Sequence, residues 1–480
     1  MSGQRAVVVG GGPNGLTAAA MLARAGWDVE VHERLAVPGG AATSSDLLGE
    51  GTVVDPGAAS FPFGVVSPAF RDLRLEEHGL EWAHAPYPMA HPLDDRPAAV
   101  LHRSLEETAD GLGRDGAAWR RLHGHLVRDI DAHVDNLLGP VLRVPPHPLA
   151  MARFGATAAL SADLLTRLAF RSPAARALFV GSAVHTIAPP TRPLTAAFGQ
   201  LFGALGMSGG WPVARGGTGR IVDALVAVLT AHGGRIHAPS DVTDLQEFAD
   251  ADAVILNLTP SQVLRLRGLD VGPLVRRRLE RWRYGPGVHK VDFLLSGPVP
   301  WADERVAGAG TVHVCGDVDD VRRAEAAVAA GRMPDRPFVM VCQQQAADPS
   351  RATGPAAGRQ VLWTYAHVPH GYMQPKPGFV RDRIVAQIER FAPGFRDVVV
   401  DAVEHSPAQL EAWNPGLVGG DLAGGVMSGL QTVLRPGFTL RPHRLRRGLY
   451  LASGATPPGA GVHGMSGHWA ARAAIRGSAG

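Results

Sequence analysis

The pattern of apolar and polar positions at the start of the chain predicts a strand, a helix and a second strand. Residues 7–9 are an apolar run followed by glycines, which predicts a buried parallel strand. The alanine-rich residues 16–25 predict a helix, and residues 28–32 predict the next strand. Strand, helix and strand in this order are typical of a βαβ-like unit.

Two later parts of the chain repeat this alternation. One predicts a helix that ends at paired glycines and is followed by short strands, at residues 221–232, 235–237, 242–245 and 253–257. The other predicts a strand over residues 448–453 and a helix over 462–476. We expect both parts to join the sheet of the first unit.

The segments between these parts have a different texture. Residues 61–210 are rich in proline and predict amphipathic helices without a βαβ rhythm, at 117–138, 159–170 and 174–184. Residues 269–429 predict four strands and a helix, at 290–295, 311–314, 338–342, 361–367 and 381–391. A chain of 480 residues exceeds one ordinary core. The sequence therefore predicts an α/β fold with a discontinuous Rossmann-type domain (1–60, 211–268 and 430–480) and an inserted α+β substrate domain (61–210 and 269–429).

The first turn carries a nucleotide-binding pattern. Its glycines fit G-x-G-x-x-G: the first makes the tight turn, the second admits a pyrophosphate, and the third lets the helix pack on the strand. The residues of this turn and of the helix start are Gly10, Gly12, Pro13, Asn14 and Gly15. The following strand ends at Glu33, whose carboxylate can accept hydrogen bonds from ribose hydroxyls. A dinucleotide is therefore the predicted ligand.

Composition excludes several classes of protein. The apolar content of 45% and charged content of 19% are globular values, and the formal charge of +3 leaves no footprint for nucleic acid. One basic cluster, residues 276–283, favours a solvated helix face over a phosphate or membrane patch. The two cysteines have no metal or redox spacing, which predicts a reducing, cytoplasmic location and no metal. No long apolar run occurs, which leaves a soluble protein or peripheral membrane contact. The oligomeric state stays open.

The residues after Glu33 extend the nucleotide motif. Glu33-Arg34, four residues and Gly39-Gly40-Ala41-Ala42-Thr43 resemble the extended FAD signature of the amine oxidase and phytoene desaturase superfamily. The resemblance implies a Rossmann-type, GR2-like FAD-binding domain with FAD as cofactor. It implies that Glu33 binds the adenosine ribose and that Arg34 and the Gly39-Gly40 turn, with Ala41 and Thr43, contact the pyrophosphate and flavin side.

The end of the chain is similar to the flavin-contacting end of phytoene-desaturase-like bacterial oxidoreductases. The implied contacts are Gly454, Gly461, Val462 and His463, and the segment at Val242 is similar to the family segment that folds against the adenine. Residues 459–464 also fit G-x-G-x-x-G, but only 16 residues follow, too few for a second nucleotide unit. We expect a helix N-terminus there that stabilises negative charge on the N1–C2=O side of a reduced flavin. The family's usual Gly-Asp is Gly454-Ala455 here.

Three residues are candidates for catalysis. Lys290 begins a strand and resembles the family lysine that holds a water at flavin N5, although a lysine facing solvent would give the same pattern. His463 and His367 are candidates for proton transfer, because histidine titrates near ~6.5. Other candidates near the cavity are His468, His370, Trp211, Trp363 and Tyr372. His367 and His370 form H-x-x-H without a third ligand, so we expect no metal.

The resemblance implies a two-electron oxidation, a desaturation or dehydrogenation, of a largely apolar small molecule by hydride transfer to flavin N5. No second nucleotide unit is predicted, so O2 or another diffusible acceptor is expected to re-oxidise the flavin. Two alternatives remain. One is a redox-neutral, FAD-dependent isomerase, and the other is a non-catalytic binding protein of the Rab-escort kind on the same fold.

Overall fold

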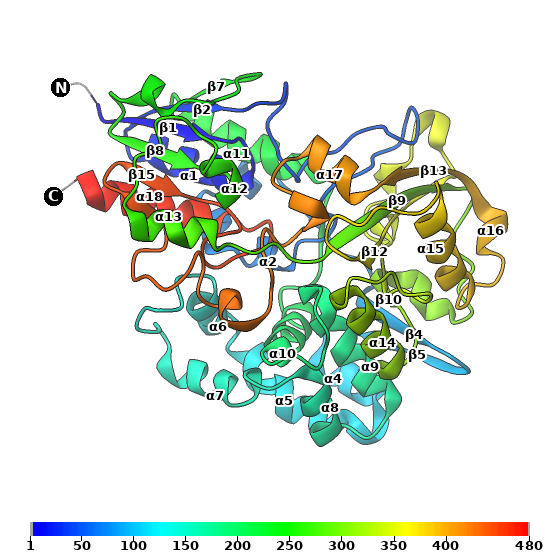
Figure 1. Ribbon diagram of the computed structural model, residues 1–480. Helices are drawn as coiled ribbons and strands as arrows, with labels where there is room; N and C mark the ends of the chain where they lie inside the picture. Colours follow the sequence, from blue (N-terminus) through cyan, green and yellow to red (C-terminus); the bar gives the residue numbers. More distant parts are fainter. Residues whose placement is uncertain (1–2, 479–480) are drawn as a thin grey trace.

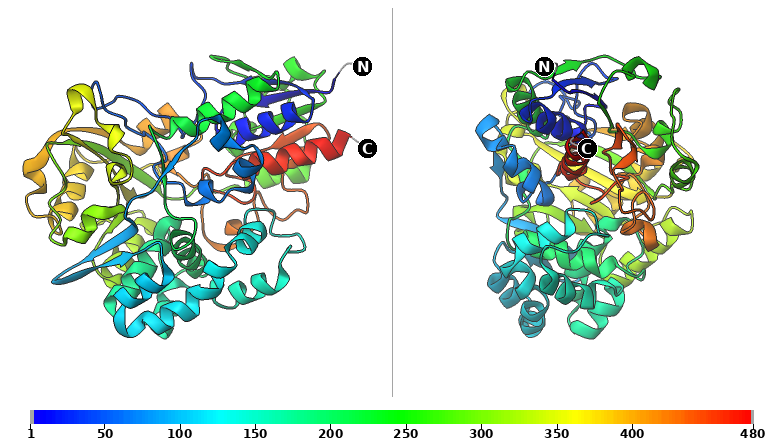
Figure 2. Two further views of the ribbon diagram at one scale, coloured as in Figure 1. Left: turned by 180° about the vertical axis from the view of Figure 1, so that it is seen from behind. Right: turned by 90° about the vertical axis from the view of Figure 1, so that its left-hand side faces the viewer.

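The computed structural model describes residues 3–478. It contains a six-stranded sheet, a seven-stranded sheet and a cluster of helices (Figure 1). The first strand and the last helix lie together at the top of both views in Figure 2. The helix cluster, in cyan and blue-green, lies at the bottom.

The first sheet brings together segments from the start, middle and end of the chain. Its order is β14-β15-β8-β1-β2-β7, with β14 (Arg444–Arg446), β15 (Leu449–Leu451), β8 (Ala253–Leu256), β1 (Arg5–Val9), β2 (Asp28–His32) and β7 (Arg235–His237). All neighbours from β15 to β7 pair in parallel. This doubly covered parallel sheet confirms the Rossmann-type α/β prediction.

Three helices bury their apolar faces on one side of this sheet. They are α1 (Pro13–Arg24), α11 (Gly219–Ala231) and α18 (Met465–Ser478). The other side is covered by the segments around α12 (Pro260–Val263) and α13 (Pro273–Glu280). Coverage on both faces explains why β1 and β8 are apolar at nearly every position.

One expected strand of this region is wrong. Residues 242–245 form an extended loop, because their backbone pairs with another loop and not with the sheet. Thr243 O accepts from Arg267 N at 2.9 Å, and Leu245 N donates to Arg267 O at 3.0 Å. Val242 therefore lies just outside the sheet edge, with its side chain packed beneath β8.

The second sheet is mixed. Its order is β13-β9-β12-β11-β10-β4-β5, with β13 (Val399–His405), β9 (Gly287–Leu295), β12 (Gln360–Val368), β11 (Val339–Cys342), β10 (Ala309–Val314), β4 (Tyr87–Leu93) and β5 (Arg96–Leu101). Only β10 and β4 pair in parallel. The expected strands from 290 to 367 are present. No strand was predicted at the positions of β4, β5 or β13, so these three strands correct the sequence-based description.

Alternation along these strands separates two environments. Residues such as Val291, Phe293 and Leu362 pack against α15 (Phe379–Glu389) on one face. Residues such as Met340 and Trp363 face the helix cluster on the other. We call this second face the site face. A strand shows alternate residues to opposite sides, so the register decides which side chains reach the site.

The helix cluster lies below the site face in Figure 1. Its members are α4 (Leu105–Gly111), α5 (Gly116–Arg128), α6 (Ile130–Leu137), α7 (Pro148–Ala158), α8 (Ala162–Ala169), α9 (Pro173–Ala183) and α10 (Thr195–Gly206). The expected long helix over 117–138 is two helices, because the chain leaves helical geometry at Asp129. The remaining elements are α2 (Pro62–Val65), α3 (Pro68–Asp72), α14 (Val318–Ala329), α16 (Phe395–Val398), α17 (Pro407–Trp413) and the pair β3 (Trp82–Ala83) and β6 (Val213–Ala214).

Candidate functional site

A cavity of about 690 Å3 lies between the carboxyl ends of the first sheet and the site face of the second. Its walls come from the β1–α1 turn, the ends of β2 and β8, the segment before α18, and the strands β10 to β12. The carboxyl end of a parallel sheet is where ligands of doubly wound folds bind.

The β1–α1 turn has no room for side chains. Gly10 has φ +98°, and a Cβ on Gly12 would lie 2.9 Å from Nδ2 of Asn257. A Cβ on Gly15 would lie 2.1 Å from the carbonyl oxygen of Gly10. The third glycine thus allows α1 to pack directly on the turn, and the second leaves open backbone at the cavity wall.

Glu33 closes this turn. Its carboxylate accepts hydrogen bonds from Gly11 N at 2.7 Å and Leu35 N at 2.9 Å, and the side chain is buried while still lining the cavity. Each carboxylate oxygen keeps a free lone pair for a further donor. The next residue, Arg34, is exposed and also lines the cavity.

Two helix N-termini meet at this wall. The first turn of α1 has no acidic residue, and its N-cap, Gly12, makes no side-chain cap. The Asn14 Oδ1 atom is buried without a partner. A Cβ on Gly467, in the first turn of α18, would lie 1.8 Å from the carbonyl oxygen of Asn14. The two helices therefore pack backbone to backbone, and both bring positive dipole ends to the site.

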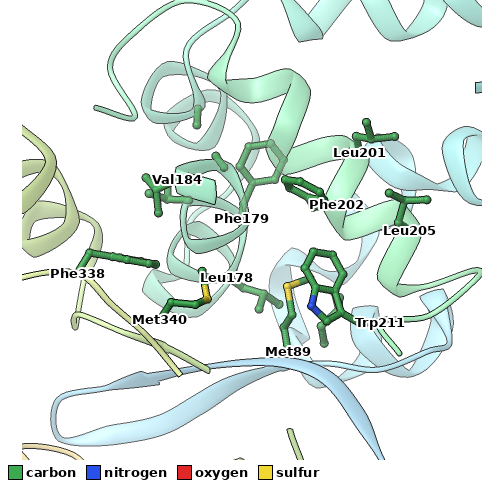
Figure 3. Packing of buried hydrophobic residues seen from close by; sticks show 14 of the residues in the cluster. Met89, Leu178, Phe179, Val184, Leu201, Phe202, Leu205, Trp211, Phe338 and Met340 are labelled. Atoms are coloured by element: carbon green, nitrogen blue, oxygen red, sulfur yellow. The ribbon is translucent and has the colours of Figure 1, made fainter. Parts of the chain in front are cut away.

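The opposite end of the cavity is walled by aromatic side chains. The ring centroids of Phe63 and Phe202 are 5.3 Å apart, those of Phe202 and Trp211 are 5.3 Å apart, and those of Trp363 and Tyr365 are 5.0 Å apart. In Figure 3, Phe202, Trp211 and Met340 lie between the helix cluster and the strands. We call this part, with its five aromatic residues, the aromatic end.

One histidine belongs to the aromatic end. His185 lines the cavity, its ring lies 5.0 Å from Phe202 and 5.4 Å from Trp211, and its Nε2 is 2.9 Å from Nε2 of His313. Burial lowers the pKa of His185 to about 3. The imidazole is therefore neutral at physiological pH and can only donate or accept a hydrogen bond. No sequence motif marks this residue, because it lies at the end of a helix among apolar positions.

Comparison with known proteins agrees with this geometry. The family model described as flavin containing amine oxidoreductase matches residues 14–268, more than half of the chain. The chain belongs to this flavoprotein family. A rat protein, pyridine nucleotide-disulfide oxidoreductase domain-containing protein 2, is 26% identical over 98% of this chain and 93% of its own. The hydroxyneurosporene desaturase of Cereibacter sphaeroides is 26% identical over 98% of this chain and 97% of its own.

A solved structure has the same fold. An oxidoreductase from Methanosarcina mazei superposes with a TM-score of 0.65 at 17% identity, over 98% of this chain and 100% of that one. FAD is thus the cofactor of this family member. The cavity fits it: a cradle of glycine backbone, an acid with free lone pairs at the end of β2, and the start of α1, which has no side-chain cap, suit ribose and pyrophosphate.

Most of the expected cofactor residues line the cavity. They are Gly10, Gly12, Pro13, Asn14, Glu33, Arg34, Gly40, Ala41, Val242, Gly454, Gly461 and Val462. Gly15, Gly39 and Thr43 lie behind this wall, where a Cβ on Gly39 would meet Thr43 Cγ2 at 2.5 Å. Asn257, Ser240 and Thr243 line it as well and were not found from the sequence, because they follow strands without a glycine signature.

The three expected catalytic residues do not line the cavity. His463 is fully buried, and its Nδ1 accepts from Met465 N at 3.0 Å, so its ring caps the start of α18. This cap explains why the helix begins at Met465 and not near 462. His367 is buried beside Glu325, with Nδ1 2.6 Å from Oε1, and stacks on Tyr365. Both imidazole rings therefore hydrogen-bond to groups of the protein interior and not to groups in the cavity.

Lys290 is on the site face of β9, but its side chain lies behind Trp363 and does not line the cavity. Its ammonium pairs with Asp292 and lies 5.1 Å from the ring centroid of Trp363, which does line the cavity. Burial lowers the pKa of Lys290 and raises the pKa of Asp292 to about 6. Lys290 is nearly inaccessible, so the solvent-facing alternative is wrong.

The other candidates fall into two groups. Trp211 and Trp363 belong to the aromatic end, whereas His468, His370 and Tyr372 do not line the cavity. His468 is three residues into α18, and His370 Nδ1 is 2.8 Å from Gly285 O.

A cluster at the edge of the first sheet has metal-ligand chemistry. Atoms of Glu30, His32 and His237 come within 4.8 Å of one another. The Glu30 carboxylate is already paired with Arg5 at 2.9 Å and Arg235 at 3.1 Å. Two guanidinium groups beside the acid oppose a cation, so the cluster carries no metal assignment. Over residues 3–478, no helix combines the length and apolarity required to cross a bilayer.

Proposed function

We propose that the chain oxidises a neutral, largely apolar small molecule by two electrons, and that the aromatic end holds the substrate. Supporting this, the charged residues of the cavity wall are Glu33, Arg34, Asp241 and Arg265. All four follow strands or helices of the first sheet, at the nucleotide end. Among the described residues that line the aromatic end, none is a carboxylate that could pair with an ammonium group and none is a cation that could pair with an acid.

The name of one relative supports the same class of reaction. The Cereibacter sphaeroides protein is called a hydroxyneurosporene desaturase, and the sequence similarity covers nearly the full length of both chains. A desaturase removes two hydrogens from neighbouring atoms. An apolar wall excludes water and orients such a substrate, which supplies the placement on which flavin chemistry depends.

We assign the nucleotide end to FAD. Glu33 accepts hydrogen bonds from the adenosine ribose, the backbone at Gly12 and the start of α1 face the pyrophosphate, and the start of α18 faces the flavin. When bound, FAD would supply a two-electron acceptor at N5, with O2 or another diffusible acceptor expected to re-oxidise it. Lys290 acts as a positioning residue, because its ammonium holds the Trp363 ring that borders the cavity.

His185 contributes a hydrogen-bonding side chain to the aromatic end. Its neutral ring and the Tyr365 hydroxyl are hydrogen-bonding groups beside the aromatic rings of this wall, to which Ser60 and Thr311 also contribute. Burial raises the pKa of Tyr365, so its hydroxyl stays protonated. A substrate with one hydroxyl or carbonyl group on an apolar skeleton would satisfy these groups, whereas an ammonium would be buried without a counter-charge.

The test is an anaerobic half-reaction with a matched set of substrates. The purified yellow protein is mixed with an isoprenoid alcohol, its parent hydrocarbon and the amine of the same skeleton, and the oxidised flavin band is followed. We expect the alcohol or the hydrocarbon to bleach the band and the amine to leave it unchanged. Bleaching by the amine alone would overturn the proposal.

The same experiment separates the alternatives. Product formed without net bleaching would replace oxidation by redox-neutral isomerisation. A protein that is colourless and takes up no FAD would point to a binding protein. Re-admission of air then shows whether O2 re-oxidises the flavin or whether a quinone is required.

A further inference from the structure

A second pocket, of about 500 Å3, lies on the outer side of α18, away from the aromatic end. Its walls are the last helix, the segment 433–444 and the segment 140–143 that follows α6. The red and orange C-terminal segment runs down to the cyan helices α6 and α7 in Figure 1. Nothing in the proposed reaction uses this pocket.

The charge of the pocket has one sign. Six arginines line it and no acidic residue does: Arg143, Arg435, Arg441, Arg444, Arg472 and Arg476. Within residues 3–478, no ion pair is formed by Arg441, Arg444, Arg472 or Arg476. Four arginines on other helices pair with acids three or four residues away, as Arg322 does with Asp319. Unpaired guanidinium groups that converge on one hollow favour an anion with several oxygens, above all a phosphate.

Two of these arginines are held in place by an aromatic ring. Arg143 lies 4.8 Å and Arg472 5.2 Å from the centroid of Trp469, on α18. Burial lowers the pKa of Arg143, with Arg472 adding to the effect. Two like charges share one ring, which is unfavourable until an anion is bound between them.

Apolar side chains surround the arginines. Val141, Leu142 and Leu440 line the pocket, and Leu440 is 77% exposed. Phe438, 74% exposed, lies on segment 433–444, and Leu149, 79% exposed, is the second residue of α7, six residues after Arg143. Large apolar groups exposed beside a basic hollow are typical of surfaces that enter the interface of an anionic bilayer.

The pocket also adjoins the wall of the FAD cavity. Arg435 is buried, lines the pocket and donates from Nη1 to Gly454 O at 2.6 Å. Gly454 lines the main cavity. The Arg435 guanidinium is also within 3.5 Å of the position that a Cβ on Gly459 would take. A ligand in the pocket is therefore separated from the wall of the FAD cavity by one residue, Arg435.

We propose that this pocket binds the phosphate group of an anionic phospholipid and that segments 140–149 and 437–441 dock the protein on an anionic bilayer. The arginines hold the headgroup, and the exposed apolar side chains enter the acyl boundary. The inference adds a surface to the proposed function and does not depend on the reaction, since docking is measured without substrate.

The test is flotation of the FAD-loaded protein with vesicles of phosphatidylcholine alone and of phosphatidylcholine with phosphatidylglycerol. We expect binding to the phosphatidylglycerol vesicles only, and we expect added salt to weaken it. The variant Arg441→Gln/Arg472→Gln/Arg476→Gln should lose about 100-fold in partition coefficient, at roughly fivefold for each basic residue. The control Arg96→Gln/Arg121→Gln/Arg359→Gln removes the same charge from exposed positions elsewhere and should bind as the parent does.

Four further outcomes decide the proposal. Equal binding to both kinds of vesicle, or equal loss in both triple variants, would overturn it. If vesicles do not bind but inorganic pyrophosphate raises the melting temperature of the parent and not of the pocket variant, the site belongs to a soluble anion and bilayer docking is wrong. Leu440→Asp/Phe438→Asp, which leaves every arginine in place, should also weaken flotation. Flavin content and melting temperature show that each variant is folded.

Discussion

The Nε2 atoms of His185 and His313 lie 2.9 Å apart, so one hydrogen is shared between two buried imidazoles. His185 faces the cavity from the end of α9, and His313 stands on the site face of β10. Burial lowers the pKa of both rings. The pair therefore stays neutral, and His313 fixes the orientation of the imidazole that lines the aromatic end of the cavity.

This pair leads to a prediction on substrate selection. His185→Phe should keep its FAD but raise KM for an alcohol substrate about 2- to 10-fold, the share of one hydrogen bond, with little change for the parent hydrocarbon. Steady-state kinetics on both substrates measure the difference. His147→Phe, at an exposed position, is the matched control. An equal rise in KM for both substrates would show that the ring only fills space.

The β1–α1 turn allows a sharp test of cofactor binding. Gly15→Ala would place a Cβ 2.1 Å from the Gly10 carbonyl oxygen, which must push α1 off the turn. We expect FAD retention to fall by at least about tenfold, because a displaced helix end no longer faces the phosphates. The flavin-to-protein absorbance ratio after purification gives the result.

Its control is Gly155→Ala in α7, where nothing lies within 4 Å of the added Cβ. This change should leave flavin content unchanged and stabilise the helix by about 0.5–1 kcal/mol. Glu33→Ala should also lower FAD retention, since it removes both the ribose acceptor and the partner of Gly11 N. Full flavin content in the Gly15 and Glu33 variants would contradict the assignment.

Variants of the buried pair Lys290 and Asp292 can distinguish a structural from a functional role of Lys290. Lys290→Met leaves the Asp292 carboxyl without its partner and should lower the free energy of unfolding by about 3–5 kcal/mol. Lys290→Met/Asp292→Leu removes both groups and should recover most of that loss. Denaturant unfolding of the three proteins gives the comparison.

Flavin kinetics of the double variant then decide the role of the lysine. If Lys290 positions the site through Trp363, flavin reduction or re-oxidation stays slow although stability has returned. Rates equal to those of the parent protein would restrict Lys290 to stabilising the interior.

Buried histidines predict a stability that falls in mild acid. Burial lowers the pKa of six of them to about 3 or 4: His91, His123, His185, His443, His463 and His468. Below pH ~6.5 the histidines of the unfolded chain bind protons, whereas the buried histidines of the native state do not. The free energy of unfolding therefore rises with pH across this range. The contribution of these histidines to stability is fully present above pH ~6.5 and is lost as the pH falls toward 4.

The loss should reach about 1 kcal/mol for each residue between pH 6.5 and 5.5, measured as a lower urea midpoint. His123→Phe, whose ring would keep the contact with Trp119, should remove one share of this pH dependence. A midpoint that does not vary between pH 7.5 and 5.5 would contradict the burial of these rings as neutral groups.

The nucleotide end could be predicted from local patterns. Strand β1, the glycine turn, α1 and Glu33 lie within 29 residues, from Arg5 to Glu33, and each carries its own steric or hydrogen-bonding requirement. Glycine alone tolerates the close approach at position 15, and an acid at a strand end has few other uses.

The aromatic end could not be found in this way. Trp363, Met340 and Thr311 share the site face only because β12, β11 and β10 pair in one register, and a shift by one residue would turn them toward α15. Lys290 illustrates the same limit: its strand was expected, but pairing with β12 sets it behind Trp363 and against Asp292. Local sequence specifies the elements and the backbone turns because those requirements act over a few residues. Contacts between strands and helices far apart in the chain depend on packing of the whole core, and that packing decides which side chains meet the substrate.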